Sequence, residues 1–298
     1  MSRLLLVIAG PTAVGKSELA VAVAERCGGE IVGADAFQVY AGLDLLTAKP
    51  AAEMRARVPH HLLGTVPLTQ AFDVGQYAAA GQRIIREIRA RGRVPILCGG
   101  TGLYLRAMTH GLAELPPADA ALRAELERRS LEDLHRELAV LDPPTAAAID
   151  RHNPRRLIRA LEVCLLTGRP FSSYRAQWAA PPEDVCGVLL TRAREELWER
   201  IAVRTEAMFA AGVVEEVRDA GEVGPTASQT LGLREIRALL VGEMDRPACM
   251  AAIAQATRQY AKRQATWFRR EPWLQPNSLS GAVDREALAN AVAALVAR

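Results

Sequence analysis

Lysine is scarce in this 298-residue chain: among its 37 basic residues only Lys16, Lys49 and Lys262 are lysines, and the rest are arginines. A sequence that has drifted towards arginine keeps lysine mainly where a compact ammonium group is needed and a planar guanidinium does not fit. The three lysines therefore mark positions at which to look for chemistry.

Several signatures of other protein classes are also missing. No apolar run approaches the roughly 18 residues that a transmembrane helix needs, and no small-residue cleavage site follows the apolar N-terminal segment. We therefore expect no membrane partner and no removed leader. The five cysteines form no C-x-x-C pair and no zinc-spaced cluster, which predicts reduced, mostly buried thiols and a cytoplasmic protein. The adjacent His60 and His61 lack a third ligand at usable spacing, so we do not expect a metal there.

The composition is that of a folded chain. Hydrophobic residues make up 50% of it, which is enough to bury a large core. The net charge of +3 permits an acidic partner such as a nucleic acid or a polyphosphate but does not demand one.

A complete G-x-x-x-x-G-K-S phosphate-binding loop begins at position 10. It consists of Gly10, Pro11, Thr12, Ala13, Val14, Gly15, Lys16 and Ser17. An apolar strand pattern over residues 4–9 precedes it, and a helical pattern over residues 17–27 follows. In such a loop the backbone N–H groups turn inward around a phosphate, the lysine adds charge, and the serine hydroxyl ligates Mg²⁺. We therefore expect a phosphate-bearing ligand here, with Ser17 as a metal ligand.

Strand-like and helical patterns alternate along much of the chain. Strands are expected over residues 4–9, 30–34, 94–98 and 185–190, with helices over 17–27 and 74–91 between them. This alternation predicts an α/β fold, with a parallel-sheet core like that of P-loop NTPases. Asp35 and the turn Gly99-Gly100-Thr101 follow two of these strands, as the phosphate loop follows the first. Because the carboxyl ends of parallel strands meet at one edge, we expect the three loops to share a crevice.

Residues 113–185 have a different character, with three Pro-Pro pairs, charge-rich helical patterns and no strand signal until their last residue. We interpret them as an all-helical insertion. The core then comprises residues 1–112 and 186–298. The second part is expected to contain C-terminal helices over residues 195–211, 249–270 and 285–298.

A phosphate loop alone favours phosphoryl transfer, and hence a kinase. The chain has no Asn-Lys-x-Asp motif that would read guanine and no catalytic Gln or arginine-lid pattern of a triphosphatase. The identity of the anion must therefore come from the rest of the chain.

Seven sequence blocks, in this order and spacing, carry a resemblance to one family. They are residues 10–17, 35–40, 47–50, 58–62, 99–104, 155–163 and 257–269, and two of them contain Lys49 and Lys262. With these blocks the chain resembles the bacterial tRNA dimethylallyltransferases, also called tRNA isopentenyltransferases, over essentially its whole length.

The resemblance implies transfer of a dimethylallyl group from dimethylallyl diphosphate to the exocyclic amine of the adenine 3′ of the anticodon, in tRNAs reading U-initial codons. Mg²⁺ is the implied cofactor, and the phosphate loop then holds a diphosphate leaving group. Asp35 matches the family's general base, which takes the proton of the amine, and Thr101 matches a threonine beside that amine. The alternative from the residues alone is a helix or turn cap for Asp35 and a helix N-cap for Thr101. This chain has Asp35-Ala36 where the family commonly has Asp-Ser.

The same resemblance implies contacts with the tRNA anticodon stem-loop. They are expected from Asp35, Ala36, Phe37, Gln38, Thr101, Arg123, Arg155, Arg156, Leu157, Ile158 and Arg159. Arg258, Lys262 and Arg269 share one helix face, which we expect to line the RNA backbone path, whereas Tyr260, Trp267 and Phe268 are expected in the core.

We expect a monomer. A prenyltransferase for free adenine nucleotides and an RNA-binding protein with a vestigial phosphate loop are the alternatives. Intact Lys16, Ser17 and Asp35 argue against the second.

Overall fold

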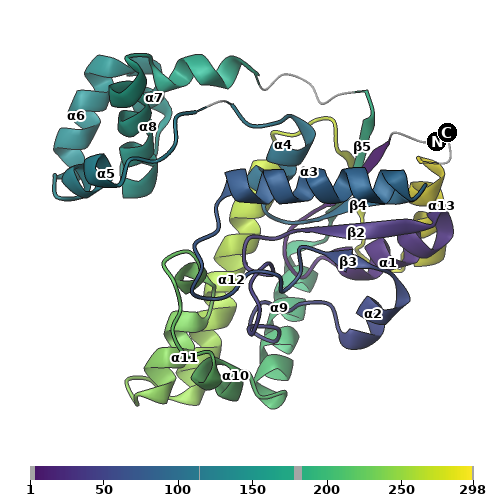
Figure 1. Cartoon of the computed structure of the whole chain (residues 1–298). Helices are drawn as coiled ribbons and strands as arrows, with labels where there is room; N and C mark the ends of the chain where they lie inside the picture. The colour runs from purple at the N-terminus through teal and green to yellow at the C-terminus, as the bar shows by residue number, and fades with distance from the viewer. Residues whose placement is uncertain (1–3, 114, 178–182, 297–298) are drawn as a thin grey trace. The chain divides into compact units, whose positions relative to one another are not determined.

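The computed structural model describes residues 4–113, 115–177 and 183–296 (Figure 1). The chain divides into two compact units, the first comprising Met1–Thr109 with Pro181–Arg298 and the second His110–Ala180. The second unit overlaps most of the insertion expected at residues 113–185, whose last residue, Val185, begins a strand. No helix among the described residues is long and apolar enough to cross a membrane.

The first unit is built on a six-stranded sheet in the order β3-β2-β4-β1-β5-β6, in which every neighbouring pair is parallel. The strands are β1 Leu5–Ala9, β2 Gly29–Ala34, β3 His60–His61, β4 Val94–Gly99, β5 Val185–Thr191 and β6 Gln275–Ser278. The α/β fold with a parallel sheet is therefore confirmed. The two edge strands, β3 and β6, were not expected, because neither carries an apolar run.

Helices cover both faces of this sheet, as Figure 1 shows for α3 on one face and α1 with α13 on the other. The helices of this unit are α1 Lys16–Cys27, α2 Ala52–Arg57, α3 Val74–Ala90, α4 Gly102–Thr109, α9 Arg194–Ala210, α10 Val213–Asp219, α11 Leu233–Leu240, α12 Arg246–Phe268 and α13 Arg285–Ala294. Along β1 the side chains alternate, so that Leu6 and Ile8 enter the core beside α1 while Leu5 and Val7 enter the core beside α3. Burial on both faces explains why β1 is a continuous apolar run.

The described residues of the second unit form helices and no strand. These are α5 Ala120–Glu127, α6 Leu131–Leu141, α7 Pro143–Ala148, α8 Pro154–Thr167 and the 3₁₀-helix η1 Phe171–Gln177. Leu126, Leu134, Leu138 and Leu161 share its core at the helical spacing of the sequence. The buried Asp142 caps α7 through Thr145 N and also accepts hydrogen bonds from Ser172, which fixes the end of this small core.

Candidate active site

The phosphate loop follows β1 and leads directly into α1, so the helix N-terminus points its free N–H groups at the loop. Gly15 has φ +110° and Ala13 φ +64°, both in the left-handed region that turns successive amides to one side. Lys16 folds back and donates from Nζ to the Pro11 carbonyl at 2.8 Å. The loop is thus preformed around an anion site.

Arginines from outside the loop hold its carbonyls and hydroxyl in place. Arg200 donates from Nε to Ala13 O at 2.8 Å, and Arg204 donates from Nη1 to Thr12 Oγ1 at 3.1 Å. Both lie four residues apart on α9 and so project from the same helix face. Neither arginine could be predicted as a site residue from the sequence, because the i, i+4 spacing is common in a charge-rich helix.

Two cations of this site, Lys16 and Arg204, are partly buried and make no ion pair among the described residues. Burial lowers the pKa of Lys16, although the nearby Cys98 and Asp35 oppose the shift. Burial also lowers the pKa of Arg204, again with Asp35 opposing. A buried cation without a partner costs free energy that a bound anion recovers. The loop is therefore electrostatically prepared for a strongly negative ligand.

Asp35 lies directly after β2, at the sheet edge where the phosphate loop also lies. Its Oδ1 accepts hydrogen bonds from Phe37 N at 2.9 Å and Gln38 N at 3.3 Å. Oδ2 takes part in no hydrogen bond found among the described residues. One oxygen is therefore a turn cap, and the other is available for chemistry.

Thr101 supports the same segment from the neighbouring strand β4. Its Oγ1 accepts a hydrogen bond from Ala36 N at 3.0 Å. The hydroxyl therefore holds the Asp35 segment, while the Thr101 carbonyl receives the first amides of α4. On the Ala36 side this bond uses only the backbone N–H, so alanine in place of serine at position 36 leaves it intact.

Gln264 on α12 joins the phosphate loop to the Gly99-Gly100-Thr101 turn. Its Oε1 accepts from Thr12 N at 2.8 Å, and its Nε2 donates to Gly100 O at 2.9 Å. A Cβ on Gly100 would lie 2.2 Å from Nε2, so only glycine allows this approach. Tyr260, expected in the core, is only partly buried: it lines a small cavity with Asp35 and has its ring centroid 6.3 Å from that of Phe37. Neither the contacts of Gln264 nor the position of Tyr260 has a local sequence signal.

A cavity of about 650 Å³ brings most of these groups together. Among its lining residues are Thr12, Ala13, Gly15, Lys16, Ser17, Asp35, Gln38, Lys49, Cys98, Arg200 and Arg204. A smaller cavity of about 40 Å³ adjoins Thr12, Asp35, Phe37, Arg204 and Tyr260. The phosphate loop and the strand-end carboxylate therefore share one crevice, as the sheet topology predicts. Burial raises the pKa of the Cys98 thiol in this cavity to about 11, so it is protonated at neutral pH.

The two histidines that line the cavity have structural partners. His61 Nε2 lies 2.7 Å from Glu30 Oε2, and His60 Nδ1 lies 2.9 Å from Val58 O. Burial raises the pKa of Glu30, but hydrogen bonds from Arg91 and His61 outweigh it and leave the net pKa below its ordinary value. The contact between His61 and Glu30 joins the edge strand β3 to its neighbour β2.

The expected RNA-contacting residues of the second unit differ in their surroundings. Arg123 donates from Nε and Nη2 to the fully buried Glu162 at 2.8 and 3.0 Å, and Arg159 pairs with the same carboxylate. Leu157 and Ile158 are buried in the helical core. Arg155 and Arg156 are exposed. Contact of these residues with RNA stays a prediction, and only Arg155 and Arg156 present guanidinium groups without a carboxylate partner among the described residues.

A second cavity, of about 780 Å³, lies along α12. The cations that line it are Arg192, Arg194, Arg258, Lys262 and Arg269, and no carboxylate lines it. Trp198 forms part of its wall, with the Arg194 Cζ 4.0 Å and the Arg258 Cζ 5.6 Å from the ring centroid. The Nε of Arg258 is buried without a hydrogen-bond partner among the described residues. The expected basic face of α12 is therefore part of a defined groove.

Comparison with known proteins gives one family. The family model described as IPP transferase matches residues 38–271. A tRNA dimethylallyltransferase of Akkermansia muciniphila is 44% identical over 96% of this chain and 97% of its own, and one of Geobacter metallireducens is 46% identical over 90% of each. The crystal structure of a tRNA isopentenylpyrophosphate transferase of Bacillus halodurans, 34% identical, superposes with a TM-score of 0.72 over 99% of this chain and 96% of that one. Because the family model covers more than half of the chain, and relatives more than 40% identical align with at least 90% of it, the chain belongs to the IPP transferase family.

Proposed function

We propose that this protein is a tRNA dimethylallyltransferase. It transfers the dimethylallyl group of dimethylallyl diphosphate to the exocyclic amine of the adenine 3′ of the anticodon, in tRNAs that read codons beginning with U. The observation that carries the proposal is the shared cavity, in which a diphosphate cradle and the carboxylate of Asp35 lie together. A kinase also needs the cradle and can use a carboxylate as a base, so the cavity decides between the two only together with membership of the IPP transferase family.

The phosphate loop stabilises the leaving group. As the C–O bond of the allylic diphosphate breaks, negative charge grows on the departing oxygens. The loop amides, the Lys16 ammonium and the Arg204 guanidinium are fixed around that position before reaction, and preorganised donors of this kind stabilise such charge strongly. Diphosphate leaves with the electron pair of the broken bond.

Asp35 activates the nucleophile. The lone pair of the adenine amine is delocalised into the ring, so the amine attacks carbon more readily when a carboxylate takes its proton as the C–N bond forms. The Oδ2 of Asp35 is the free acceptor, while Oδ1 is held by Phe37 N and Gln38 N. Asp35 also lines the larger cavity, through which a flipped-out adenine would reach it, while Phe37 and Tyr260 line the small cavity on its other side.

A magnesium ion fits the donors present. The Ser17 hydroxyl lines the cavity together with Glu18 and Asp35, and Mg²⁺ prefers a few protein oxygens with substrate phosphates and water completing its shell. Ser17 would hold the ion, which supplies charge neutralisation for the diphosphate.

The tRNA is expected to follow two basic surfaces. One is the α12 groove with Arg258, Lys262 and Arg269, and the other is the exposed pair Arg155 and Arg156 of the helical insertion. Both offer cations without carboxylate partners, which is the arrangement that phosphate groups need. We propose that the enzyme works as a monomer in the cytoplasm.

The test is incubation with dimethylallyl diphosphate, Mg²⁺ and an unmodified tRNA that contains the target adenine, followed by mass analysis of the nucleosides. One C₅H₈ unit should be added to adenosine. A tRNA in which guanine replaces the target adenine is the matched control and should gain nothing. Modification of free AMP at the rate of tRNA would favour the free-nucleotide enzyme, and absence of any product alongside a competent enzyme would refute the proposal.

A further inference from the structure

Lys49 is a buried cation whose role the phosphate loop does not explain. Its side chain is 1% exposed, although an ammonium group is strongly hydrated and costly to bury unless it is paired. It ends the segment 35–49, which begins at Asp35 immediately after β2. Lys49 lines the same cavity as Asp35 and Gln38.

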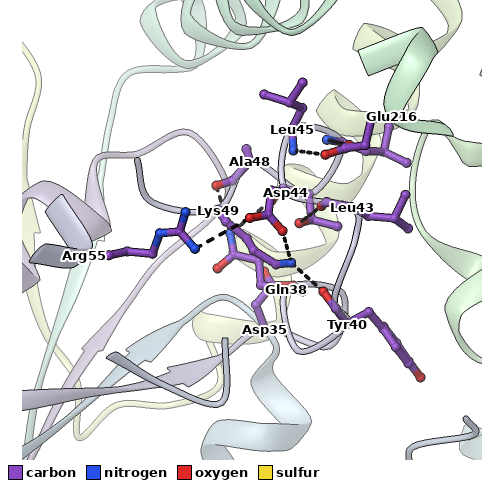
Figure 2. A network of polar contacts seen from close by, with 12 residues as sticks. Asp35, Gln38, Tyr40, Leu43, Asp44, Leu45, Ala48, Lys49, Arg55 and Glu216 are labelled. Carbon is purple, nitrogen blue, oxygen red and sulfur yellow. Dashed lines mark hydrogen bonds and ion pairs between the residues drawn. The ribbon is translucent and has the colours of Figure 1, made fainter. Parts of the chain in front are cut away.

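The ammonium group closes this segment on itself. Its Nζ donates to the Tyr40 carbonyl and to Asp44 Oδ1, the latter at 2.6 Å, as Figure 2 shows. Asp44 Oδ2 also lies 3.6 Å from Arg55 Nη1, at a half-exposed position. Lys49 therefore joins the end of the segment to its middle.

Gln38 makes a second closure in the same place. Its Nε2 donates to the carbonyls of Thr47 and Ala48, each at 3.0 Å, which are the two residues before Lys49. Ala48 has φ +50°, a left-handed conformation that a non-glycine residue keeps only when its surroundings impose it. The backbone N–H of Gln38 in turn bonds to Asp35 Oδ1. A continuous path of contacts thus runs from Lys49 through Gln38 to Asp35.

The space around Nζ explains why lysine was kept here. A Cβ placed on Gly64 would lie 3.4 Å from Nζ, so the backbone passes close to the ammonium group. A guanidinium is wider and planar, and it cannot reproduce the two bonds of a point donor in that space. In a chain with three lysines among 37 basic residues, this steric limit is a physical reason for having lysine and not arginine at position 49.

We propose that Lys49 is a positioning residue: it holds residues 47–48 so that Gln38, and through it the Asp35 carboxylate, keeps its place beside the diphosphate cradle. The inference rests on the proposed function. The fold of the segment does not depend on Lys49 alone, because Glu216 of α10 also accepts hydrogen bonds from Leu45 N and Leu46 N at 2.7 and 2.8 Å. Loss of the ammonium group should therefore loosen the Asp35 end without unfolding the protein.

The experiment compares Lys49→Met and Lys49→Arg with Arg55→Met, which removes the other cation of Asp44. For both Lys49 variants we expect kcat with tRNA to fall about 10- to 100-fold, as small misplacements of a reacting group do. The KM for dimethylallyl diphosphate should stay within about twofold, since the phosphate loop is untouched. Arg55→Met should change neither by more than about twofold.

A double-mutant cycle with Gln38→Ala tests the route. If Lys49 acts through Gln38, the double variant should lose no more activity than Gln38→Ala alone. Fully additive losses, or full activity in Lys49→Arg, would overturn the proposal.

Amide hydrogen exchange of the free enzyme gives a readout that does not need activity. Exchange in residues 36–48 should become faster in Lys49→Met, while exchange in α1 should not change. Unchanged exchange in residues 36–48 would overturn the positioning role even in an active enzyme. Failure of the wild-type protein to modify tRNA would instead refute the proposed function and leave this readout valid.

Discussion

At Asp35 the two carboxylate oxygens have different surroundings. Oδ1 accepts hydrogen bonds from Phe37 N and Gln38 N, and Oδ2 is the oxygen that we propose takes the proton of the adenine amine. The two interpretations of this residue from sequence, a turn cap and a general base, are therefore compatible, because they concern different atoms of one side chain.

Asp35→Asn separates these two tasks. The amide oxygen of asparagine can still accept from Phe37 N and Gln38 N, whereas the amide cannot take a proton from the amine. We expect kcat to fall by about two to four orders of magnitude, with the affinity for tRNA changed far less. Steady-state kinetics and a filter-binding assay measure the two quantities. Equal losses of binding and turnover would make Asp35 a structural residue.

Asp35 and Lys16 could be predicted from the sequence because each belongs to a local pattern, a strand end or a glycine loop. Arg204 and Gln264 could not be predicted in this way. Their partner in the phosphate loop, Thr12, lies 192 and 252 residues away along the chain. Only the fold brings such contacts together, and no local periodicity records them.

At the level of elements, predictability follows burial. The strand β1 is buried on both faces, so its apolar run is visible in the sequence. The strand β6 is Gln275–Ser278, with the sequence QPNS, and it joins the sheet only through backbone pairing with β5. An edge strand of this kind has no side-chain pattern by which it could be predicted.

The helices α5 and α8 meet at Glu162, and their pairing should depend on pH. Burial raises the pKa of Glu162, but hydrogen bonds from Arg123 and Arg159 outweigh it, so the net pKa lies below the ordinary value of 4.5. A carboxylate with a lowered pKa adds stability that is fully present above pH 4.5 and is lost as pH falls through its folded pKa. The protection of the α5 and α8 amides, measured relative to their intrinsic exchange rates at each pH, should therefore decrease below pH 4.5.

Glu162→Gln should remove much of this pH dependence and destabilise the second unit at pH 7 by about 2 kcal/mol, because two arginines lose a buried carboxylate. Glu137→Gln is the matched control, since its half-exposed pair with Arg129 in the same unit should be worth less than about 1 kcal/mol. Exchange rates of α5 and α8 that are equal in the two variants would contradict this account. It also follows that replacing Arg123 perturbs the unit itself, so Arg155 and Arg156 are the cleaner positions at which to probe RNA contact.

The α12 groove makes a prediction about salt. If Arg258 and Lys262 each contact a tRNA phosphate, Arg258→Gln and Lys262→Gln should each lower the slope of log affinity against log salt by about one. Arg218→Gln, on the exposed surface of α10, should leave the slope unchanged. Binding measured between low and high salt gives the slopes. An unchanged slope in both groove variants would place the RNA elsewhere.

At the scale of the whole molecule, the alternation of strands and helices was enough to predict a parallel α/β core with its loops at one sheet edge. The same alternation cannot say which anion the phosphate loop holds, because a kinase and a prenyltransferase place the same loop at the same edge. The additional information comes from the Asp35 carboxylate and from membership of the IPP transferase family.

We propose that the phosphate loop holds a leaving group that departs from carbon. The decisive measurement counts the diphosphate released against the adenines modified when the enzyme acts on tRNA with dimethylallyl diphosphate, with ATP in a parallel reaction. We expect one diphosphate for each prenylated adenine and no phosphoryl transfer from ATP. Turnover of ATP with transfer of its phosphate, without prenylated adenine, would contradict it.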